Sequence, residues 1–234
     1  MHTAKQSTYR TLEYANLGLV SYQETWDFQK LTLEQRLKNE IPDTFYMLEH
    51  PHTYTLGKTA DGKNLLFNNI ELEKKGITVF EIDRGGDITY HGPGQIVGYP
   101  IINLKEWKQD THLYLRNLEE VLIRTCADFG LNAGRSEGLT GVWIENRKIA
   151  AIGIKVSRWI TMHGFAFNVN TDLDLFDGII PCGITDKKVT SLKQELGNEI
   201  KIKNVHEIIL KYFKEIFEYD EVIVKQKDSL SVIV

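Results

Sequence analysis

The sequence is poor in cysteine and proline and has no long hydrophobic run. Its 234 residues include two cysteines and five prolines. Two thiols cannot make a disulfide-rich scaffold or a four-cysteine zinc site. Cys126 and Cys182 are therefore apolar filler, the halves of one disulfide, or reactive thiols. No apolar stretch approaches the roughly 20 residues that a membrane-spanning helix needs, so we expect no membrane span.

An excess of charge of one sign is also missing. Twenty-eight Lys and Arg residues stand against 32 Asp and Glu, a net charge of −4. A pI near 6.0 gives no general attraction to nucleic acid. The polar segment 1–10 lacks the apolar core of a signal peptide, so we expect a reducing, cytoplasmic location. The seven histidines show no metal-ligand spacing, and we expect no metal and no cofactor.

The composition is that of an ordinary globular protein. Apolar residues make up 42% and charged residues 26% of the chain. A chain of this length can bury roughly 70% of the surface that its unfolded form exposes, without help from metals or disulfides. No repeat or Pro/Gly/Ser-rich linker divides it, so a single domain spanning 1–234 is expected.

The apolar pattern predicts helices and strands without strict alternation. Helices are predicted over 22–40, ending before Pro42; from an Asp110 N-cap to about Phe129, closed by Gly130; and over 205–217. Strands are predicted over 44–48, 77–82, 95–102, 142–144, 149–156 and 160–169. This order favours an α+β fold over a doubly wound sheet.

The most unusual segment is RGGDITYHGPGQ at 84–95, with four glycines and a proline between apolar strands. Glycine allows a close backbone approach to a ligand, and successive N–H groups can hold an oxyanion or carbonyl. The segment is neither a Walker A loop nor GxGxxG, so it does not indicate a nucleotide. A long hairpin connection explains its composition equally well.

The two cysteines occupy different settings. Cys182 lies between Pro181 and Gly183 after an apolar run, an arrangement that suits an accessible nucleophile. A small apolar residue in a turn is the alternative. Cys126 falls on the apolar face of the helix expected before Phe129, so we assign it to the core.

A nucleophilic cysteine needs a base or a cation, for which His91, His163, Lys148 and Lys155 are candidates. Strand alternation places Lys148 on one face with Ala150, Ile152, Ile154 and Val156, and Lys155 on the other. Periodicity does not choose between the two lysines, or between either of them and an ordinary surface charge. Similarly, residues 162–170 fit a strand lining an apolar pocket or any core strand.

These segments, in this order, resemble the lipoyl(octanoyl) transferases. The matching pieces are RGGDITYHGPGQ at 84–95, RKIAAIG at 147–153, HGFAFNVN at 163–170, PCGI at 181–184 and VTSL at 189–192. The resemblance implies a fold like that of biotin and lipoate protein ligases, a mixed sheet with helices on one side. It also implies transfer of an octanoyl group from acyl carrier protein to a lysine of lipoyl domains.

The same resemblance implies which residues act. Cys182 would form an acyl thioester, and Lys148, rather than Lys155, would lie near it and lower its pKa. The substrate-binding residues that it implies are Arg84, Gly85, Gly86, Asp87, Ile88, Thr89, Tyr90, His91, Ala151, Ile152, Gly153, Gly164, Phe165 and Ala166. The acceptors would be the lipoyl domains of 2-oxoacid dehydrogenase complexes and the glycine cleavage H protein. A monomer is expected, with no nucleic-acid or membrane partner.

Other functions on this scaffold are an ATP-dependent lipoate or biotin ligase, a lipoyl amidotransferase and a non-catalytic binding protein. The PCG element argues against the ligase, which needs no nucleophilic cysteine. With a net charge of −4, docking of an acidic carrier would require a local basic patch. The candidates are Arg158, Lys187, Lys188 and Lys193, with an ordinary solvated surface as the alternative.

Overall fold

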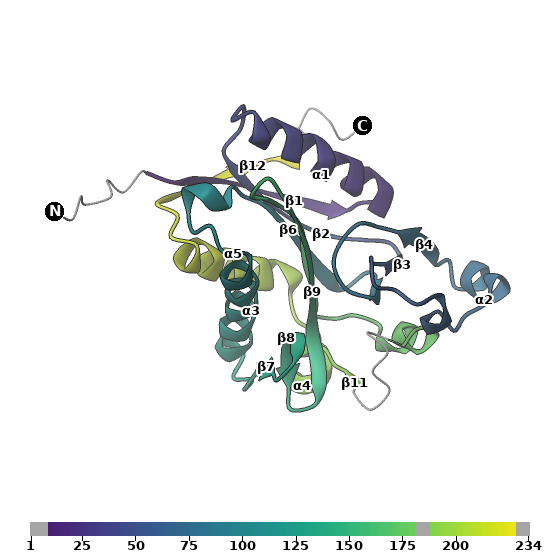
Figure 1. Ribbon diagram of the computed structural model, residues 1–234. Helices are drawn as coiled ribbons and strands as arrows, with labels where there is room; N and C mark the ends of the chain where they lie inside the picture. Colours follow the sequence, from purple (N-terminus) through teal and green to yellow (C-terminus); the bar gives the residue numbers. More distant parts are fainter. Residues whose placement is uncertain (1–8, 181–187, 228–234) are drawn as a thin grey trace.

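The computed structural model describes residues 9–180 and 188–227, and within these ranges nine strands form one mixed sheet (Figure 1). Its order is β12-β1-β2-β6-β10-β9-β8-β7, with β11 paired to β9. The β1–β2, β1–β12 and β9–β11 pairs are parallel and the others antiparallel. The strands are β1 (Thr11–Leu19), β2 (Asp43–Glu49), β6 (Gln95–Ile101), β7 (Gly134–Ser136), β8 (Leu139–Ile144), β9 (Arg147–Ser157), β10 (Ile160–Asn168), β11 (Lys188–Val189) and β12 (Glu221–Lys225).

Helices cover both faces of this sheet. The alternation of β2 shows why: Phe45 and Met47 pack with α3 (Thr111–Asp128) and α5 (Ile202–Ile216), whereas Tyr46 and Leu48 face α1 (Tyr22–Leu37). The mixed sheet with flanking helices is confirmed, but the expectation that the helices lie on one side is wrong. Apolar side chains leave both faces of the central strands, so each face needs a helical cover (Figure 1).

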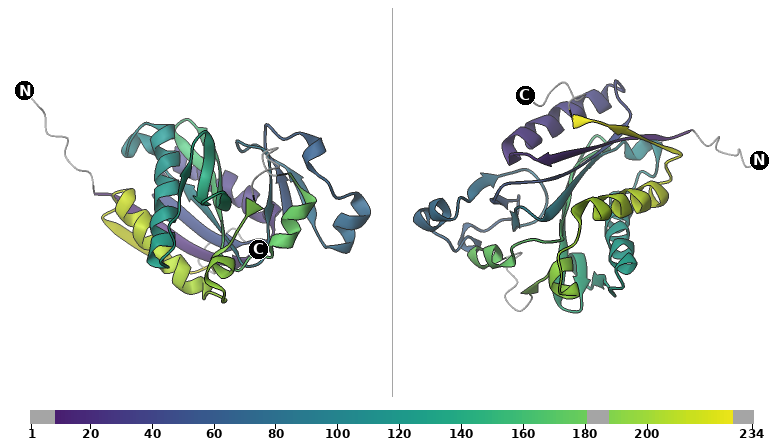
Figure 2. Two further views of the ribbon diagram at one scale, coloured as in Figure 1. Left: turned by 90° about the horizontal axis from the view of Figure 1, so that it is seen from below. Right: turned by 180° about the vertical axis from the view of Figure 1, so that it is seen from behind.

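A second, three-stranded sheet lies beside the first, at the end of the molecule that also carries α2 (Asn69–Lys74) (Figure 2). Its order is β4-β3-β5, from Thr78–Glu81, Thr53–Leu56 and Ile88–His91. Tyr54 and Tyr90 are fully buried in its own apolar cluster. β5 pairs with β3, whereas β6 pairs with β2 and β10, so the glycine-rich segment crosses between two sheets. It is therefore not a hairpin connection.

The longer predicted elements are confirmed. The Asp110 carboxylate accepts hydrogen bonds from the N–H groups of His112 and Leu113 and caps α3, and Gly130 follows its end with a φ of 74°. The core assignment of Cys126 is also confirmed, since its side chain is fully buried and burial raises the pKa of its thiol to about 12. β1, β3, β5, β7, β11 and β12 were not predicted. The short helices are α2, α4 (Leu192–Leu196) and the 3-10 turns η1 (Gly62–Asn64), η2 (Leu104–Glu106) and η3 (Leu173–Gly178).

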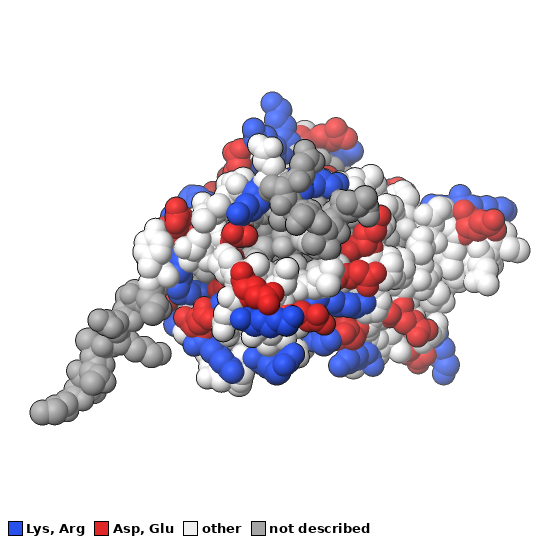
Figure 3. All heavy atoms as spheres, turned by 90° about the horizontal axis from the view of Figure 1, so that it is seen from above, with Lys and Arg blue, Asp and Glu red and all other residues white. Residues whose placement is uncertain are grey.

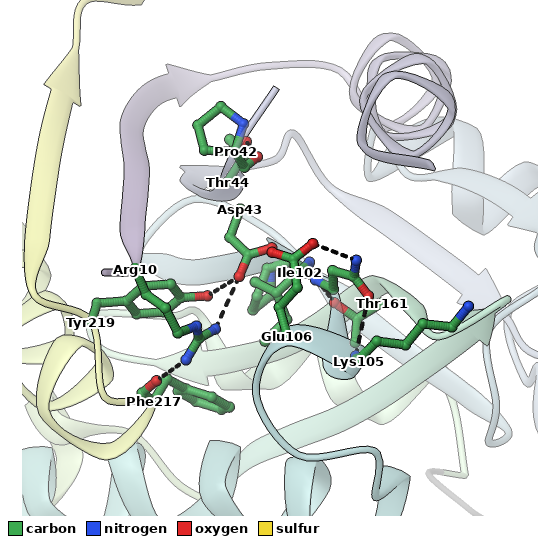
Figure 4. A network of polar contacts seen from close by, with 12 residues as sticks. Arg10, Pro42, Asp43, Thr44, Ile102, Lys105, Glu106, Thr161, Phe217 and Tyr219 are labelled. Carbon is green, nitrogen blue, oxygen red and sulfur yellow. Dashed lines mark hydrogen bonds and ion pairs between the residues drawn. The ribbon is translucent and has the colours of Figure 1, made fainter. Parts of the chain in front are cut away.

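A buried carboxylate ties the two ends of the described chain to the sheet (Figure 4). Asp43 at the start of β2 accepts hydrogen bonds from Arg36 of α1, from Arg10 before β1 and from the Tyr219 hydroxyl after α5. The main-chain N–H of Asn103 donates a fourth, at 2.8 Å. This network joins the start of β2 to the segments before β1 and after α5. No helix within residues 9–180 and 188–227 has the length and hydropathy to cross a membrane.

Candidate active site

A cavity of about 330 Å³ lies where the glycine-rich segment meets the middle of the main sheet. β9 and β10 form one wall, the segment that begins at Arg84 forms another, and Leu115 of α3 with Leu139 and Thr140 of β8 contributes a third. The lining is mostly apolar, with polar groups set into it at a few positions. A cavity with this lining suits a small or extended apolar ligand whose orientation is fixed by a few polar contacts.

Arg84 anchors the glycine-rich segment. Its guanidinium is nearly buried and donates hydrogen bonds to the carbonyl and the hydroxyl oxygen of Thr55, at 2.8 and 3.0 Å. The Gly85 N–H donates to the carbonyl of Ile154 and so joins the segment to β9. A Cβ atom on Gly153 would stand 2.8 Å from the Arg84 Cδ, which explains the glycine in β9. The segment is thus laid closely across the strand that bears Lys148.

Lys148 lines the cavity from the start of β9. Its ammonium lies 4.7 Å from the ring centroid of the buried Trp143. Its stem passes over Gly141, where a Cβ atom would stand 3.5 Å from the Lys148 Cε. Gly141 has a φ of 123° and the β8–β9 register shifts beside it, between Val142 and Trp143. The irregular strand pair therefore leaves room for the lysine stem and directs it along the cavity wall.

Lys155 lies elsewhere on the same strand. Its ammonium forms an ion pair with Asp83, and it is not among the cavity-lining residues. Alternation correctly separated the two lysines: Ala150, Ile152 and Ile154 pack toward the core under α3, whereas Lys155 points to the opposite side. Only Lys148, of the two, is placed where it can act on a ligand in the cavity.

The candidate histidines are both engaged in buried hydrogen bonds. His91 contacts the Gln95 amide oxygen through Nδ1 at 2.9 Å and the Thr55 hydroxyl through Nε2 at 3.3 Å. The Nε2 atom of His163 lies 2.9 Å from an Asp83 carboxylate oxygen. Burial lowers the pKa of His91 well below its usual value and also lowers the pKa of His163, which the Asp83 carboxylate partly offsets. Burial therefore favours the neutral form of both rings, which form part of the cavity wall.

Cys182 lies outside the described residues, but the chain on either side of it is anchored at the cavity. Before it, the Ile180 N–H donates to the carbonyl of Asn64, whose amide donates to Asp87 of the glycine-rich segment at 2.6 Å. After it, Val189 pairs with Lys148 and the Thr190 N–H donates to the Lys148 carbonyl.

The structure brings the separated motifs to one place. Thirteen of the fourteen residues expected to bind substrate line the cavity together with Lys148. The exception is Tyr90, whose ring is fully buried in the core of the small sheet and whose hydroxyl contacts His52 Nδ1 at 2.8 Å. A direct contact between Tyr90 and a ligand stays a prediction.

Sequence reasoning missed several lining residues. Gln95 and Asn168 lie inside the motifs and are joined by a 2.9 Å hydrogen bond from the Gln95 amide. Their polar side chains on apolar strands were the available signal. The remaining residues carry no such signal, because each is an ordinary apolar or aromatic core residue whose role depends on where the chain folds. They include Tyr22, Val97, Tyr99, Leu115, Leu139, Phe176 and Val189.

Comparison with known protein families and curated relatives gives a consistent result. The family model described as the lipoyl protein ligase A/B catalytic domain matches residues 21–214. An octanoyltransferase of Christiangramia forsetii is 53% identical over 226 residues, covering 89% of this chain and 97% of that one. An octanoyltransferase of Rubrobacter xylanophilus is 52% identical over 201 residues, covering 85% and 90%.

The chain therefore belongs to the lipoyl protein ligase A/B catalytic domain family. Within that family it resembles most clearly the proteins named octanoyltransferase, as the motifs had indicated.

Solved structures show the same fold at low sequence identity. Lipoate-protein ligase A bound with ATP superposes with a TM-score of 0.72 at 15% identity, covering 96% of this chain and 93% of that one. A bi-partite lipoate protein ligase from Thermoplasma acidophilum gives a TM-score of 0.71 at 17% identity, covering 95% and 91%. The expected lipoate-ligase fold is confirmed. Within the described part of the chain, no cluster of three or more His, Cys, Asp or Glu side chains could hold a metal ion.

Proposed function

We propose that this protein is an acyltransferase that moves an octanoyl group from acyl carrier protein to a lysine of lipoyl domains. The observation that carries the proposal is the cavity, which collects Lys148 and thirteen residues from three separate motifs in a chain about half identical to named octanoyltransferases. An apolar cavity with the Lys148 ammonium at its wall suits an aliphatic acyl chain that carries a reactive carbonyl at one end.

In the proposed reaction Cys182 is the nucleophile. Its thiolate attacks the carbonyl of the octanoyl thioester, the bond to the carrier sulfur breaks, and the carrier leaves as a thiol with one proton. A neutral lysine amine of the acceptor then attacks the acyl-enzyme, forms an amide, and releases Cys182 as the thiolate while its own proton is lost. Lys148 stabilises the thiolate as a nearby cation, or takes the proton of the Cys182 thiol and returns it to the departing carrier sulfur. A thioester is already activated, so neither step requires ATP.

The acyl chain supplies much of the binding energy in this proposal. Each buried CH₂ group is worth about 0.8 kcal/mol, so a seven-carbon tail gives several kcal/mol. Ala151, Gly153 and Gly164 keep the wall of the cavity free of bulky side chains. The cytoplasmic location, the monomeric state, and the 2-oxoacid dehydrogenase and glycine cleavage H protein acceptors belong to the same proposal.

The basic residues considered for carrier docking lie at different places in the described chain. Arg158 follows β9 at one end of a strand about 33 Å long at roughly 3.3 Å per residue, whereas Lys188 pairs with Arg147 at the other end. Lys193 forms a 3.0 Å ion pair with Glu199, and Lys187 lies outside the described residues. Lys188, at the far end of β9, therefore does not form one basic patch with Arg158. On the face seen from above, positive and negative groups are interspersed (Figure 3).

The test of the nucleophile is intact mass after mixing the protein with octanoyl acyl carrier protein. Wild type should gain the mass of one octanoyl group less one hydrogen. It should then pass the octanoyl group to a lipoyl domain. Cys182→Ala should do neither, and Cys126→Ala, at a fully buried position within α3, should still become acylated. Acylation or transfer by Cys182→Ala would overturn the thioester mechanism.

The test of Lys148 is the pH dependence of Cys182 alkylation, followed by peptide mass mapping. If the Lys148 ammonium stabilises the thiolate, Lys148→Ala should raise the apparent thiol pKa toward the ordinary value of about 8.5. Lys155→Ala, which removes a lysine on the opposite side of the same strand, is the matched control and should leave the thiol pKa unchanged. An unchanged pKa in Lys148→Ala would contradict the assigned role.

An ATP-dependent ligase remains the alternative that the fold suggests, because the lipoate-ligase structures share it. Free octanoate with ATP separates the two activities: a ligase would release pyrophosphate and modify the acceptor, whereas the proposed transferase requires the thioester donor. A lipoyl amidotransferase is separated by donor preference, since it would accept a lipoylated protein in place of the carrier.

A further inference from the structure

A closed ring of hydrogen bonds encloses the main chain at Lys148. The carbonyl of Lys148 accepts from the Thr190 N–H at 2.9 Å. The Thr190 hydroxyl donates to Oε1 of Glu195 at 2.6 Å. The same carboxylate accepts from Arg147, the residue before Lys148, at 2.9 and 3.2 Å. The Glu195 carboxylate of α4 therefore binds both Arg147, which precedes Lys148, and Thr190, whose N–H donates to the Lys148 carbonyl.

Few main-chain pairs join this segment to β9, although the buried Leu192 that follows packs in the main core. β11 is two residues long and makes only two registered pairs with β9, Lys188 with Arg147 and Val189 with Lys148. Asn168 of β10 adds a hydrogen bond from its amide to the Thr190 carbonyl at 3.0 Å. A two-residue parallel pairing is weak, because each pair contributes a small fraction of a sheet's stability. The side-chain ring therefore adds a direct link between this segment and the start of β9.

Glu195 is suited to this task by its surroundings. Its side chain is 13% exposed and Thr190 is fully buried, so the hydrogen bonds are shielded from water. The pKa of the Glu195 carboxyl is lowered, because the hydrogen bonds from Arg147 and Thr190 outweigh the effect of burial. Arg147 also pairs with Glu145, but that side chain is 75% exposed. The Arg147 guanidinium thus binds two carboxylates, the shielded one of Glu195 and the exposed one of Glu145.

We propose that Glu195 is a positioning residue that holds Lys148 at the cavity by clamping Arg147 and Thr190. This inference rests on the proposed function, because it takes Lys148 as the group that acts on the nucleophile. Glu195 contacts neither the cavity lining nor the acyl chain. Its carboxylate fixes the main chain from which the Lys148 side chain extends, and losing that contact lets the lysine stem move away from its course over Gly141 and Trp143.

The experiment compares Glu195→Gln with Glu145→Gln. Glu195→Gln should lower kcat for octanoyl transfer about tenfold, the effect of weakening one hydrogen-bonded charge contact, with KM unchanged. It should also raise the apparent thiol pKa of Cys182 in the alkylation assay and speed exchange of the Thr190 amide hydrogen. Glu145→Gln removes the exposed partner of the same arginine and should change none of these within twofold.

Two further comparisons separate this inference from the proposed function. In a Lys148→Ala background, Glu195→Gln should have no additional effect on kcat; an equal loss in both backgrounds would overturn the positioning role. A thiol pKa that shifts in Lys148→Ala but not in Glu195→Gln would overturn the positioning role alone. An unshifted pKa in Lys148→Ala would overturn both.

The Thr190 variants separate the positioning role from a general loss of stability. Thr190→Val should reproduce the Glu195→Gln effect, whereas Thr190→Ser, which keeps the hydroxyl, should behave like wild type. A general loss of stability would not give this pattern.

Discussion

At the residue scale, Gly164 shows that a motif glycine can be required by strand packing as well as by a ligand. It lies in β10 beside β6, and a Cβ atom there would stand 2.1 Å from the carbonyl oxygen of Gly98 and 2.7 Å from Pro100. Gly98 in turn leaves space for the Phe165 ring, which lines the cavity. The two glycines let the strands approach so that an aromatic ring can form the cavity wall.

Gly164→Ala should therefore lower the free energy of unfolding by about 1–3 kcal/mol, since the clash is with a main-chain oxygen that cannot turn aside. Gly134→Ala, in β7, is the matched control, because nothing lies within 4 Å of its added Cβ and its effect should stay within about 0.5 kcal/mol. Urea denaturation measures both. Equal stability of the two variants would show that β6 and β10 separate readily.

At the element scale, Asp43 joins α1, β2 and the two ends of the described chain. It is 4% exposed, and Arg36 and Arg10 both bring positive charge to it. Removing this buried carboxylate leaves Arg10 without its ion-pair partner and Arg36 with only the half-exposed Glu106, so Asp43→Ala should cost about 3–5 kcal/mol of stability. Asp27→Ala, which breaks an exposed ion pair with Lys30, should cost less than about 1 kcal/mol. Urea midpoints decide between them; comparable costs would mean that the network around Asp43 contributes no more than a surface pair.

Helices and strands also differ in how well they can be predicted from the sequence. α3 and α5 were predicted because their apolar stripes are long and local, and Asp110 caps the first by a contact two and three residues away. β12 was not predicted, because it is five residues long and is defined by pairing with β1, about 210 residues earlier. Strands β3 and β5 are four residues each and depend on the same kind of distant pairing.

In the candidate site, too, local patterns could be predicted from the sequence and contacts between distant residues could not. Motif residues such as Arg84 and Lys148 could be predicted from their unusual neighbours and their resemblance to a family. The clamp of Glu195 on Arg147 and Thr190 could not, since it joins residues whose side chains are ordinary in the sequence. Tyr90 is the opposite case: it lies in the motif, but its ring is buried in the core of the small sheet. A motif therefore identifies a segment, and the fold around that segment determines which of its side chains reach the cavity.

At the scale of the whole molecule, buried histidines link stability to pH. His50, His91, His163 and His206 are all buried, and burial lowers the pKa of each. For His50 and His206 the pKa falls from 6.5 to about 4. The folded protein therefore resists protonation that the unfolded chain accepts, and acid favours unfolding.

The free energy of unfolding should be greatest above pH 6.5 and fall as the pH drops from 6.5 to 4, where the unfolded chain binds more protons. A pKa lowered from 6.5 to about 4 corresponds to about 3 kcal/mol for each histidine, present above pH 6.5 and lost by pH 4. His206→Gln removes one titrating group, so its stability should fall less steeply over this interval, by up to about 1.4 kcal/mol per pH unit. Urea denaturation at intervals between pH 7.5 and 4 measures the slope, with His112→Gln on the exposed side of α3 as the control. A slope for His206→Gln equal to that of wild type would show that His206 is protonated without cost in the folded state, and that acid destabilises the molecule through other groups.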